Sequence, residues 1–228
     1  MRILLIGHGR MGQLVESLAP GYGCEVAGIV TEDSEPKAIE RGEFGAVDAA
    51  IDFSLADAVP ANFPQLAARG ISVVIGATGW QAREAEMRAL AERAGIGVLA
   101  SANFSIVMQI FQRAVETAAA AFAAHPDYGA WIHERHHSAK KDAPSGTALM
   151  LKAAMKDAGY ERAIDVSSAR AGAAPGIHAV GFDGPSDVIT LTHEVRDRAV
   201  FARGALEAAK WLKGRRGWFT MRDMIEMQ

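Results

Sequence analysis

A run of histidine, lysine and small polar residues over positions 133–147 carries the most concentrated chemistry in the chain. Three of the seven histidines, His133, His136 and His137, lie there, and the run continues through Lys140 to the sequence Pro-Ser-Gly-Thr. Such a run could bind a metal, supply an acid or base for catalysis, or form a solvated polar turn. Adjacent histidines rarely point at one ion, and no further ligand accompanies them at helical spacing, so we expect no metal here.

The catalytic interpretation accounts for the most residue types. Imidazole titrates nearest neutrality, so His136 could deliver a proton at physiological pH, and the ammonium of Lys140 would lower its pKa and make it a better acid. The Ser-Gly-Thr sequence opens an expected helix over 147–158, and the first amides and positive dipole end of a helix form an anion site. Together with His137, this segment is suited to a small dicarboxylate.

A second motif, Gly7-x-Gly9-x-x-Gly12, directly follows an apolar run. In such a motif the first glycine permits a tight turn, the second lets a pyrophosphate approach the backbone, and the third lets a helix pack on the strand. The phosphates would sit at the N-terminus of that helix. A purely structural turn remains open, but the acidic Glu32, about twenty residues further on, favours a dinucleotide.

Acidic side chains after the second expected strand bear on the choice of nicotinamide cofactor. Glu32 or Asp33 could bond a free ribose 2′-hydroxyl and would repel a 2′-phosphate, which favours NADH over NADPH. Arg10 could compensate for the acidic charge, so both cofactors stay open. The segments 76–79 and 101–104 follow two further strands with small residues, at the sheet edge where a dinucleotide passes.

The elements that must position these motifs alternate between strand and helix. Apolar runs predict strands at 2–6, 25–30, 49–53, 72–75 and 97–100, with helices ending at residue 18 and covering 56–68 and 81–94 between them. This alternation predicts a Rossmann-like, doubly wound parallel sheet of the α/β class.

A Met- and Ala-rich helix over 105–124 begins a smaller α+β domain with a mixed sheet, for which we expect strands near 130–134, 176–182 and 188–195. The last helix, 201–213, should pack back on the first domain. The predicted boundaries are 1–104 with 204–228 for the dinucleotide-binding domain, and 105–203 for the substrate domain.

The composition limits the class of protein. With 24 Lys and Arg against 27 Asp and Glu, the formal net charge is -3, so we expect no diffuse cationic surface for nucleic acid. The apolar runs are too short for a membrane span or a signal peptide. A single cysteine, Cys24, excludes an intramolecular disulfide and fits a reducing cytoplasm. We therefore expect a cytoplasmic enzyme that holds anionic ligands through local clusters.

These motifs resemble the dihydrodipicolinate reductase family, also called 4-hydroxy-tetrahydrodipicolinate reductases, of bacterial and plant lysine and diaminopimelate biosynthesis. The similarity is densest in the segment His136-His137-x-x-Lys140-x-Asp142-Ala143-Pro144-Ser145-Gly146-Thr147-Ala148. Further similar stretches are Gly9-Arg10-Met11-Gly12, Asp52-Phe53-Ser54, Gly76-x-Thr78-Gly79 and Asn103-Phe104-Ser105.

The resemblance implies an NAD(P)H-dependent reduction of the dehydrated form of 4-hydroxy-tetrahydrodipicolinate to tetrahydrodipicolinate, by a homotetramer assembled through the second domain. It implies His136 as proton donor and acceptor, Lys140 as a second proton donor, and His137, Gly146 and Thr147 as substrate contacts. The motifs and the resemblance together give the expected cofactor contacts: Gly7, Gly9, Arg10, Met11, Gly12, Glu32, Gly76, Ala77, Thr78, Ser101, Ala102, Asn103 and Phe104.

Two other functions stay open at this point. A nucleotide-sensing protein could keep the same fold without chemistry; it would bind the cofactor but transfer no hydride. A different NAD-dependent imine reductase or an enzyme like an aspartate dehydrogenase would share the first domain. Such an enzyme should lack the His-His-x-x-Lys segment.

Overall fold

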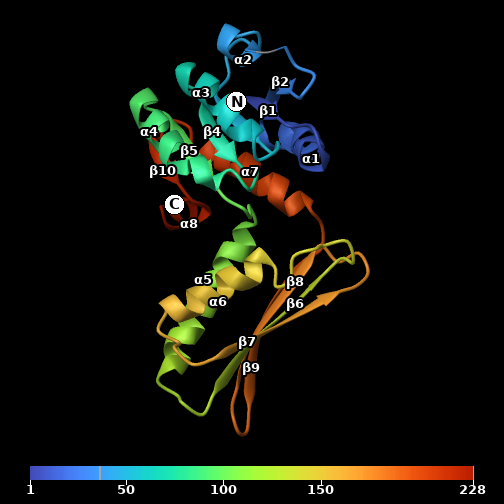
Figure 1. The fold of residues 1–228 in the computed structure, drawn as a ribbon, viewed down its shortest axis with the longest axis vertical. Coiled ribbons are helices and arrows are strands. Elements are labelled where there is room, and N and C mark those ends of the chain that lie inside the picture. Colours follow the sequence, from blue (N-terminus) through green and yellow to red (C-terminus); the bar gives the residue numbers. More distant parts are fainter. Residues whose placement is uncertain (36, 228) are drawn as a thin grey trace. The chain divides into compact units, whose positions relative to one another are not determined.

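The computed structural model describes residues 1–35 and 37–227 and divides the chain into two compact units (Figure 1). Unit 1 contains Met1–Ile106 and the chain from Ala199 on, and unit 2 contains Val107–Arg198. The sequence prediction placed the return to the first domain at residue 204. The structure places it at Ala199, the first residue of helix α7 (Ala199–Trp211), so this helix lies wholly in unit 1.

Unit 1 is built on a six-stranded sheet in the order β10-β5-β4-β3-β1-β2, in which all neighbours are parallel. The strands are β1 (Arg2–Ile6), β2 (Glu25–Val30), β3 (Ala49–Asp52), β4 (Ser72–Ile75), β5 (Gly97–Ala100) and β10 (Gly217–Phe219). The predicted parallel sheet is confirmed. Strand β10 was not predicted, because three residues are too few to carry a periodic signal.

Helices cover both faces of this sheet. They are α1 (Arg10–Leu18), α2 (Ala38–Arg41), α3 (Ala58–Ala68), α4 (Glu84–Ala94), α7 and α8 (Met221–Glu226), with short 3-10 turns η1 (Ala19–Tyr22) and η2 (Gln81–Arg83). Ile3 and Leu5 pack in one core with α1, α7 and α8, whereas Leu4 and Ile6 pack in a second core with α3 and α4. Burial on both faces explains why these strands are continuous apolar runs, and it confirms that the last long helix packs on the first domain.

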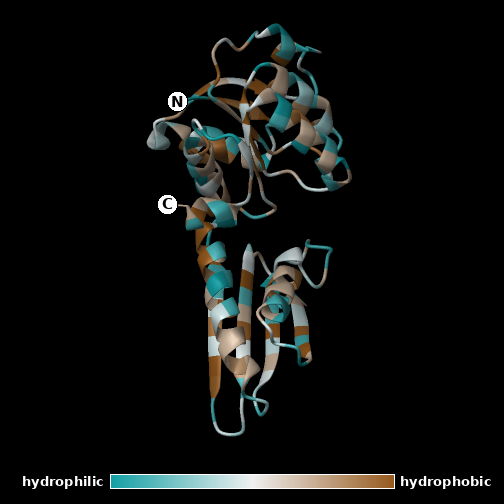
Figure 2. Ribbon diagram, turned by 90° about the vertical axis from the view of Figure 1, so that its left-hand side faces the viewer, coloured by the Kyte–Doolittle hydropathy of each residue, from teal (hydrophilic) through white to brown (hydrophobic). Residues whose placement is uncertain are grey.

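Unit 2 combines two helices with a mixed four-stranded sheet in the order β7-β6-β8-β9. Its elements are α5 (Ile106–Ala123, from Val107 on), β6 (Gly129–His136), α6 (Gly146–Asp157), β7 (Ile164–Arg170), β8 (Gly176–Asp183) and β9 (Val188–Val195). β6 pairs parallel with β7 and antiparallel with β8. Helices α5 and α6 cover one face with a shared apolar core. Figure 2 shows hydrophobic and hydrophilic bands alternating along these strands.

Two features of unit 2 differ from the sequence prediction. Strand β7 was not predicted, because the sequence Ile-Asp-Val-Ser-Ser-Ala-Arg is polar, as suits the edge of a sheet. Strand β6 was expected to end at residue 134 but continues to His136, so this histidine lies on the sheet rather than in a loop. Among the described residues, no helix is long and apolar enough to cross a membrane.

Candidate active site

Two glycines of the first motif are required by packing. Gly7 has a φ of +85°, and a Cβ there would lie 2.8 Å from the Cα of Ser54. A Cβ at Gly12 would lie 2.2 Å from the carbonyl oxygen of Gly7. A larger residue at Gly7 would push the turn away from the backbone of Phe53 and Ser54, and one at Gly12 would push helix α1 away from the turn.

Gly9 differs from its two neighbours in the motif. A Cβ at this position would meet no atom within 4 Å, and its φ of -73° is open to any residue. It caps the N-terminus of α1, whose first amides have no partner within the helix. The free space therefore lies over an N-terminus suited to an anion, and these residues fit the pyrophosphate of a nicotinamide dinucleotide.

The segment Asp52–Ser54 joins two of the expected cofactor loops. Its backbone packs against Gly7, and the ring of Phe53 occupies the space of a side chain at Gly76, since a Cβ there would lie 2.1 Å from the ring. The amide of Gly76 donates to the carbonyl oxygen of Asp52 at 2.8 Å. The sequence marked this segment only by resemblance; the structure shows that it holds the two loops in place.

The buried carboxyl of Asp52 predicts a pH dependence of stability. Burial raises its pKa from 3.8 to about 6, although the hydroxyl and amide of Ser54 donate to it. Because the folded chain holds this proton more tightly than the unfolded chain, the carboxyl contributes stability below pH 3.8 and loses it as the pH rises through about 6. The difference between these two pKa values corresponds to about 3 kcal/mol in the free energy of unfolding.

The isosteric variant Asp52→Asn should remove this pH dependence, because the asparagine side chain does not ionise. Its amide oxygen can still accept from the amide and hydroxyl of Ser54. We expect the variant to match the wild type below pH 3.8 and to exceed its free energy of unfolding above about pH 6. Urea unfolding at both ends of this interval measures the difference. A constant difference between the two proteins across the interval would contradict the prediction.

The remaining expected cofactor contacts surround this framework. The loop over 101–104 is tied to β4 by the Ser101 amide, which donates to the carbonyl of Ile75 at 3.0 Å, and a Cβ at Gly204 of α7 would lie only 1.8 Å from the carbonyl oxygen of Phe104. Glu32 lies exposed, two positions beyond the end of β2. Of the others, Ala77 is buried, Met11 and Asn103 are half-buried, and Arg10, Thr78 and Ala102 are exposed.

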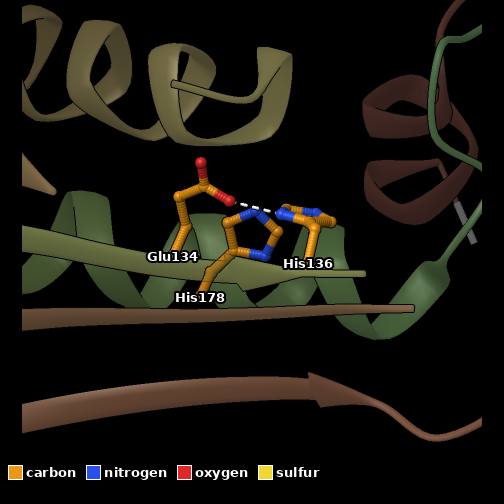
Figure 3. Close-up of side chains that lie close together, drawn as sticks. All are labelled: Glu134, His136 and His178. Carbon is orange, nitrogen blue, oxygen red and sulfur yellow. Dashed lines mark hydrogen bonds and ion pairs between the residues drawn. The ribbon is translucent and has the colours of Figure 1, made fainter. Parts of the chain in front are cut away.

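In unit 2, strand register brings together polar residues that are distant in sequence. Glu134 of β6 stands opposite Ser168 of β7 and His178 of β8, and His178 stands opposite His193 of β9. His136 is two residues further along β6, opposite Arg170. Figure 3 shows Glu134, His136 and His178 pointing to the same side of the sheet.

Glu134 is the centre of this cluster and is fully buried. The guanidinium of Arg170 donates to both of its carboxylate oxygens, at 2.7 and 3.0 Å, and the Ser145 amide donates to one of them at 3.2 Å. The other oxygen accepts from Nδ1 of His136. Burial alone would raise the pKa of Glu134, but the bonds from Arg170, Ser168 and His136 outweigh it and lower the pKa to about 2.

His136 is buried and its charge state is set by opposing effects. Burial lowers its pKa, the hydrogen bond and charge of Glu134 raise it, and the charges of Lys140 and Arg170 lower it, with a net lowering. The predicted direction of the Lys140 effect is therefore right, but the direct partner of the ring is Glu134. The ammonium of Lys140 instead pairs with Asp142 at 2.7 Å.

The N-terminus of helix α6 is a second candidate anion site, where the Gly146 amide donates to the carboxylate of Asp142. Ser145 caps the helix by accepting from the Ala148 amide at 3.2 Å, and the same hydroxyl lies 3.2 Å from Nε2 of His178. A Cβ at Gly146 would meet no atom within 4 Å, so this glycine is not required by packing and leaves room for a ligand, as at Gly9. Thr147 follows it, half-buried.

The other two histidines near the site have different surroundings. Nε2 of His137 lies 3.4 Å from the guanidinium of Arg198, which adds positive charge beside the expected substrate contact. Burial lowers the pKa of His178 to about 4, helped by the charge of His136. His178 is therefore neutral near pH 7 and is suited to a structural hydrogen bond rather than to acid catalysis.

Sequence reasoning missed Glu134, Arg170 and His178 as members of one site. The candidate ligand atoms of Glu134, His136 and His178 lie within 4.8 Å of one another, close enough to suggest a metal site. A cation there would face the guanidinium of Arg170 and would break the existing bonds to Glu134. These contacts argue against a metal, and that no metal binds here stays a prediction. The only sequence signal was the alternation along 130–136, which places Glu134 and His136 on one face.

Comparison with known proteins places this chain among oxidoreductases. The family model described as dihydrodipicolinate reductase, N-terminus, matches residues 1–104, and the one described as dihydrodipicolinate reductase, C-terminus, matches residues 107–225. The 4-hydroxy-tetrahydrodipicolinate reductase of Acidiphilium cryptum is 37% identical, over 99% of this chain and 97% of that protein. The protein of the same name from Christiangramia forsetii is 32% identical, over 99% and 98%.

A solved structure has the same fold. The dipicolinate-bound dihydrodipicolinate reductase from Paenisporosarcina sp. TG-14 aligns with a TM-score of 0.78 at 21% identity, over 96% of this chain and 97% of that one. The parallel sheet, its glycine turn and the matched families define a nicotinamide-dependent oxidoreductase. The chain belongs to the dihydrodipicolinate reductase family.

Proposed function

We propose that this chain catalyses the NAD(P)H-dependent reduction of the dehydrated form of 4-hydroxy-tetrahydrodipicolinate to tetrahydrodipicolinate, in lysine and diaminopimelate biosynthesis. One observation carries this proposal beyond family membership. Within unit 2, a single carboxylate, Glu134, bonds both the ring of His136 and the amide of Ser145, the cap of helix α6. A proton donor and an anion site are thereby held by the same group.

The proposed proton donor is His136. Because Nδ1 is bonded to a carboxylate, it must carry a hydrogen, and Nε2 is the atom left to exchange a proton. A nicotinamide cofactor held at the glycine turn Gly7–Gly12 would supply the hydride. His136 then supplies the proton that the reduced ring requires, with Lys140 as second donor. The ion pair between Lys140 and Asp142 has to open, or to share its proton, for that second role.

The proposed substrate contacts are suited to carboxylates. Gly146 and Thr147 begin helix α6, where the helix dipole attracts an anion. The Gly146 amide donates to the carboxylate of Asp142, which a substrate carboxylate would replace. His137, with Arg198 beside it, adds positive charge for the second carboxylate of a dicarboxylate. The net charge of -3 therefore does not conflict with an anionic substrate, because the positive groups are local.

We propose NADH as the preferred cofactor, on the acidic residues that follow β2. Glu32 is exposed, so its carboxylate can reach a free 2′-hydroxyl and repels a 2′-phosphate. The variant Glu32→Ser should raise the ratio of kcat/KM for NADPH to that for NADH by about 10-fold, which corresponds to about 1.4 kcal/mol. Parallel steady-state assays measure the ratio, with Asp33→Ser as the matched variant. An unchanged ratio in both variants would show that neither Glu32 nor Asp33 determines the choice between NADH and NADPH.

The proposal also includes a homotetramer assembled through unit 2, acting in the cytoplasm. Both points rest on the resemblance to the family. Light scattering coupled to size-exclusion chromatography tests the first: a mass four times that of the chain is expected, and a monomer would contradict it.

The reaction itself is tested by cofactor consumption. The purified chain should oxidise NADH or NADPH only when the fresh product of dihydrodipicolinate synthase is supplied. Cofactor binding without turnover on this or related cyclic imines would favour a nucleotide-sensing protein. Reduction of NAD⁺ with L-aspartate would favour an aspartate dehydrogenase, although the His-His-x-x-Lys segment argues against it.

A further inference from the structure

The group bonded to the ring of His136 is a fully buried carboxylate. Glu134 is 0% exposed, and each of its oxygens is bonded to Arg170, at 2.7 and 3.0 Å. A buried charge is costly unless it is paired and hydrogen-bonded, and here the guanidinium fork supplies both. Glu134 therefore stays ionised with a fixed orientation, and it also accepts from His136, the Ser145 amide and Ser168.

We propose that Glu134 is the positioning residue of this site: it holds His136 with the hydrogen on Nδ1, leaves Nε2 to exchange the proton, and anchors the start of α6. The inference deepens the proposed function and rests on the proposed role of His136. Arg170 is part of the same device, since its guanidinium also donates to the backbone carbonyl of Asp142 and so ties the Lys140 loop to the cluster.

The packing around the imidazole supports this assignment. Nε2 of His136 is 3.0 Å from where a Cβ of Gly176 would lie, so the glycine on β8 leaves the ring space. The charged or titratable groups that face the ring are Glu134 on its own strand, Arg170 on β7, His178 on β8 and Lys140 in the following loop. Glu134 is the only one of these four that favours the protonated ring.

Glu134→Gln tests the inference, because glutamine keeps the shape and removes the charge. Without the carboxylate, protonated His136 loses its stabilising partner, so its pKa should fall by about 1 pH unit or more. The high-pH limb of kcat, which reports the protonated acid, should move down by the same amount. At pH 7, kcat should fall about 10- to 100-fold, part of what a positioned acid supplies. KM for substrate should change less than kcat.

Nuclear magnetic resonance of the histidine ring nitrogens gives a readout that does not need turnover. In the wild-type chain without ligands, His136 should carry its hydrogen on Nδ1, and its titration should move to lower pH in Glu134→Gln. The matched control is Glu194→Gln, which removes the same charge from an exposed position on β9 and should leave both readouts unchanged. If the guanidinium of Arg170, left without its carboxylate partner, prevents folding, the double variant Glu134→Gln with Arg170→Gln is measured in place of the single variant.

The outcomes separate this inference from the proposed function. An unchanged His136 titration and an unchanged kcat profile in a folded Glu134→Gln variant would overturn the positioning role, even if the chain is an active reductase. A shifted titration in a chain that reduces no imine would support the positioning role and overturn the proposed function alone. A loss of stability without a shift would mean that Glu134 is purely structural.

Discussion

Replacing His136 by alanine is expected to lower kcat by about 10²- to 10⁴-fold, the usual contribution of a positioned general acid. The fold should persist, because Glu134 keeps its bonds to Arg170 and Ser145 when the imidazole is removed. The double variant with Lys140→Ala should have no measurable turnover, since both proposed proton donors are then absent.

Steady-state kinetics and thermal unfolding, measured on the same preparations, check this expectation. His133→Ala is the matched control, because His133 lies on the same strand but is exposed and bonds Ser167. The control should retain wild-type kcat. Normal turnover in the folded His136 and Lys140 double variant would reject the catalytic assignment of both residues.

The glycine motif predicts a second large effect, which separates binding from folding. Gly9→Ala should lower the melting temperature of the free chain only slightly, because a Cβ at this position meets no atom within 4 Å and the change costs only the weaker N-cap preference of alanine. Cofactor affinity should fall about 10- to 100-fold, because the methyl group displaces a phosphate from charge-assisted bonds to the amides of α1.

Gly12→Ala should behave in the opposite way. Its Cβ would lie 2.2 Å from the carbonyl of Gly7, so the variant should melt at a lower temperature even without cofactor. Gly21→Ala, where a Cβ also meets nothing within 4 Å, controls for the loss of a glycine outside the motif. Calorimetric titration with NADH measures the cofactor affinity. A wild-type affinity in Gly9→Ala would show that the pyrophosphate does not bind at this turn.

The sequence was sufficient where hydrophobic runs and glycines act locally. Strands β1, β2, β4 and β5 have the predicted bounds, because each is a short apolar run bounded by turn residues. The helix expected over 147–158 begins one residue earlier, at Gly146, because Ser145 is an N-cap that the sequence already displays.

The sequence was insufficient where strand register decides which side chains meet. His178 lies 44 positions from Glu134 in the chain and Arg170 lies 36, yet pairing across β8 and β7 places both beside the same carboxylate. Residue types alone suggested Lys140 as the partner of His136, because it is close in sequence. The polar edge strand β7, which supplies Arg170, lacked the apolar alternation that would have revealed it.

The fate of the hydride shows directly whether this chain carries out the proposed reduction. The chain should be supplied with NADH carrying deuterium at both positions of nicotinamide C4 and with the fresh product of dihydrodipicolinate synthase, and the product analysed by mass spectrometry. We expect tetrahydrodipicolinate that contains one deuterium per molecule, formed by the wild-type chain and not by the His136 and Lys140 double variant. Tetrahydrodipicolinate without deuterium, or oxidised cofactor without tetrahydrodipicolinate, would contradict this expectation.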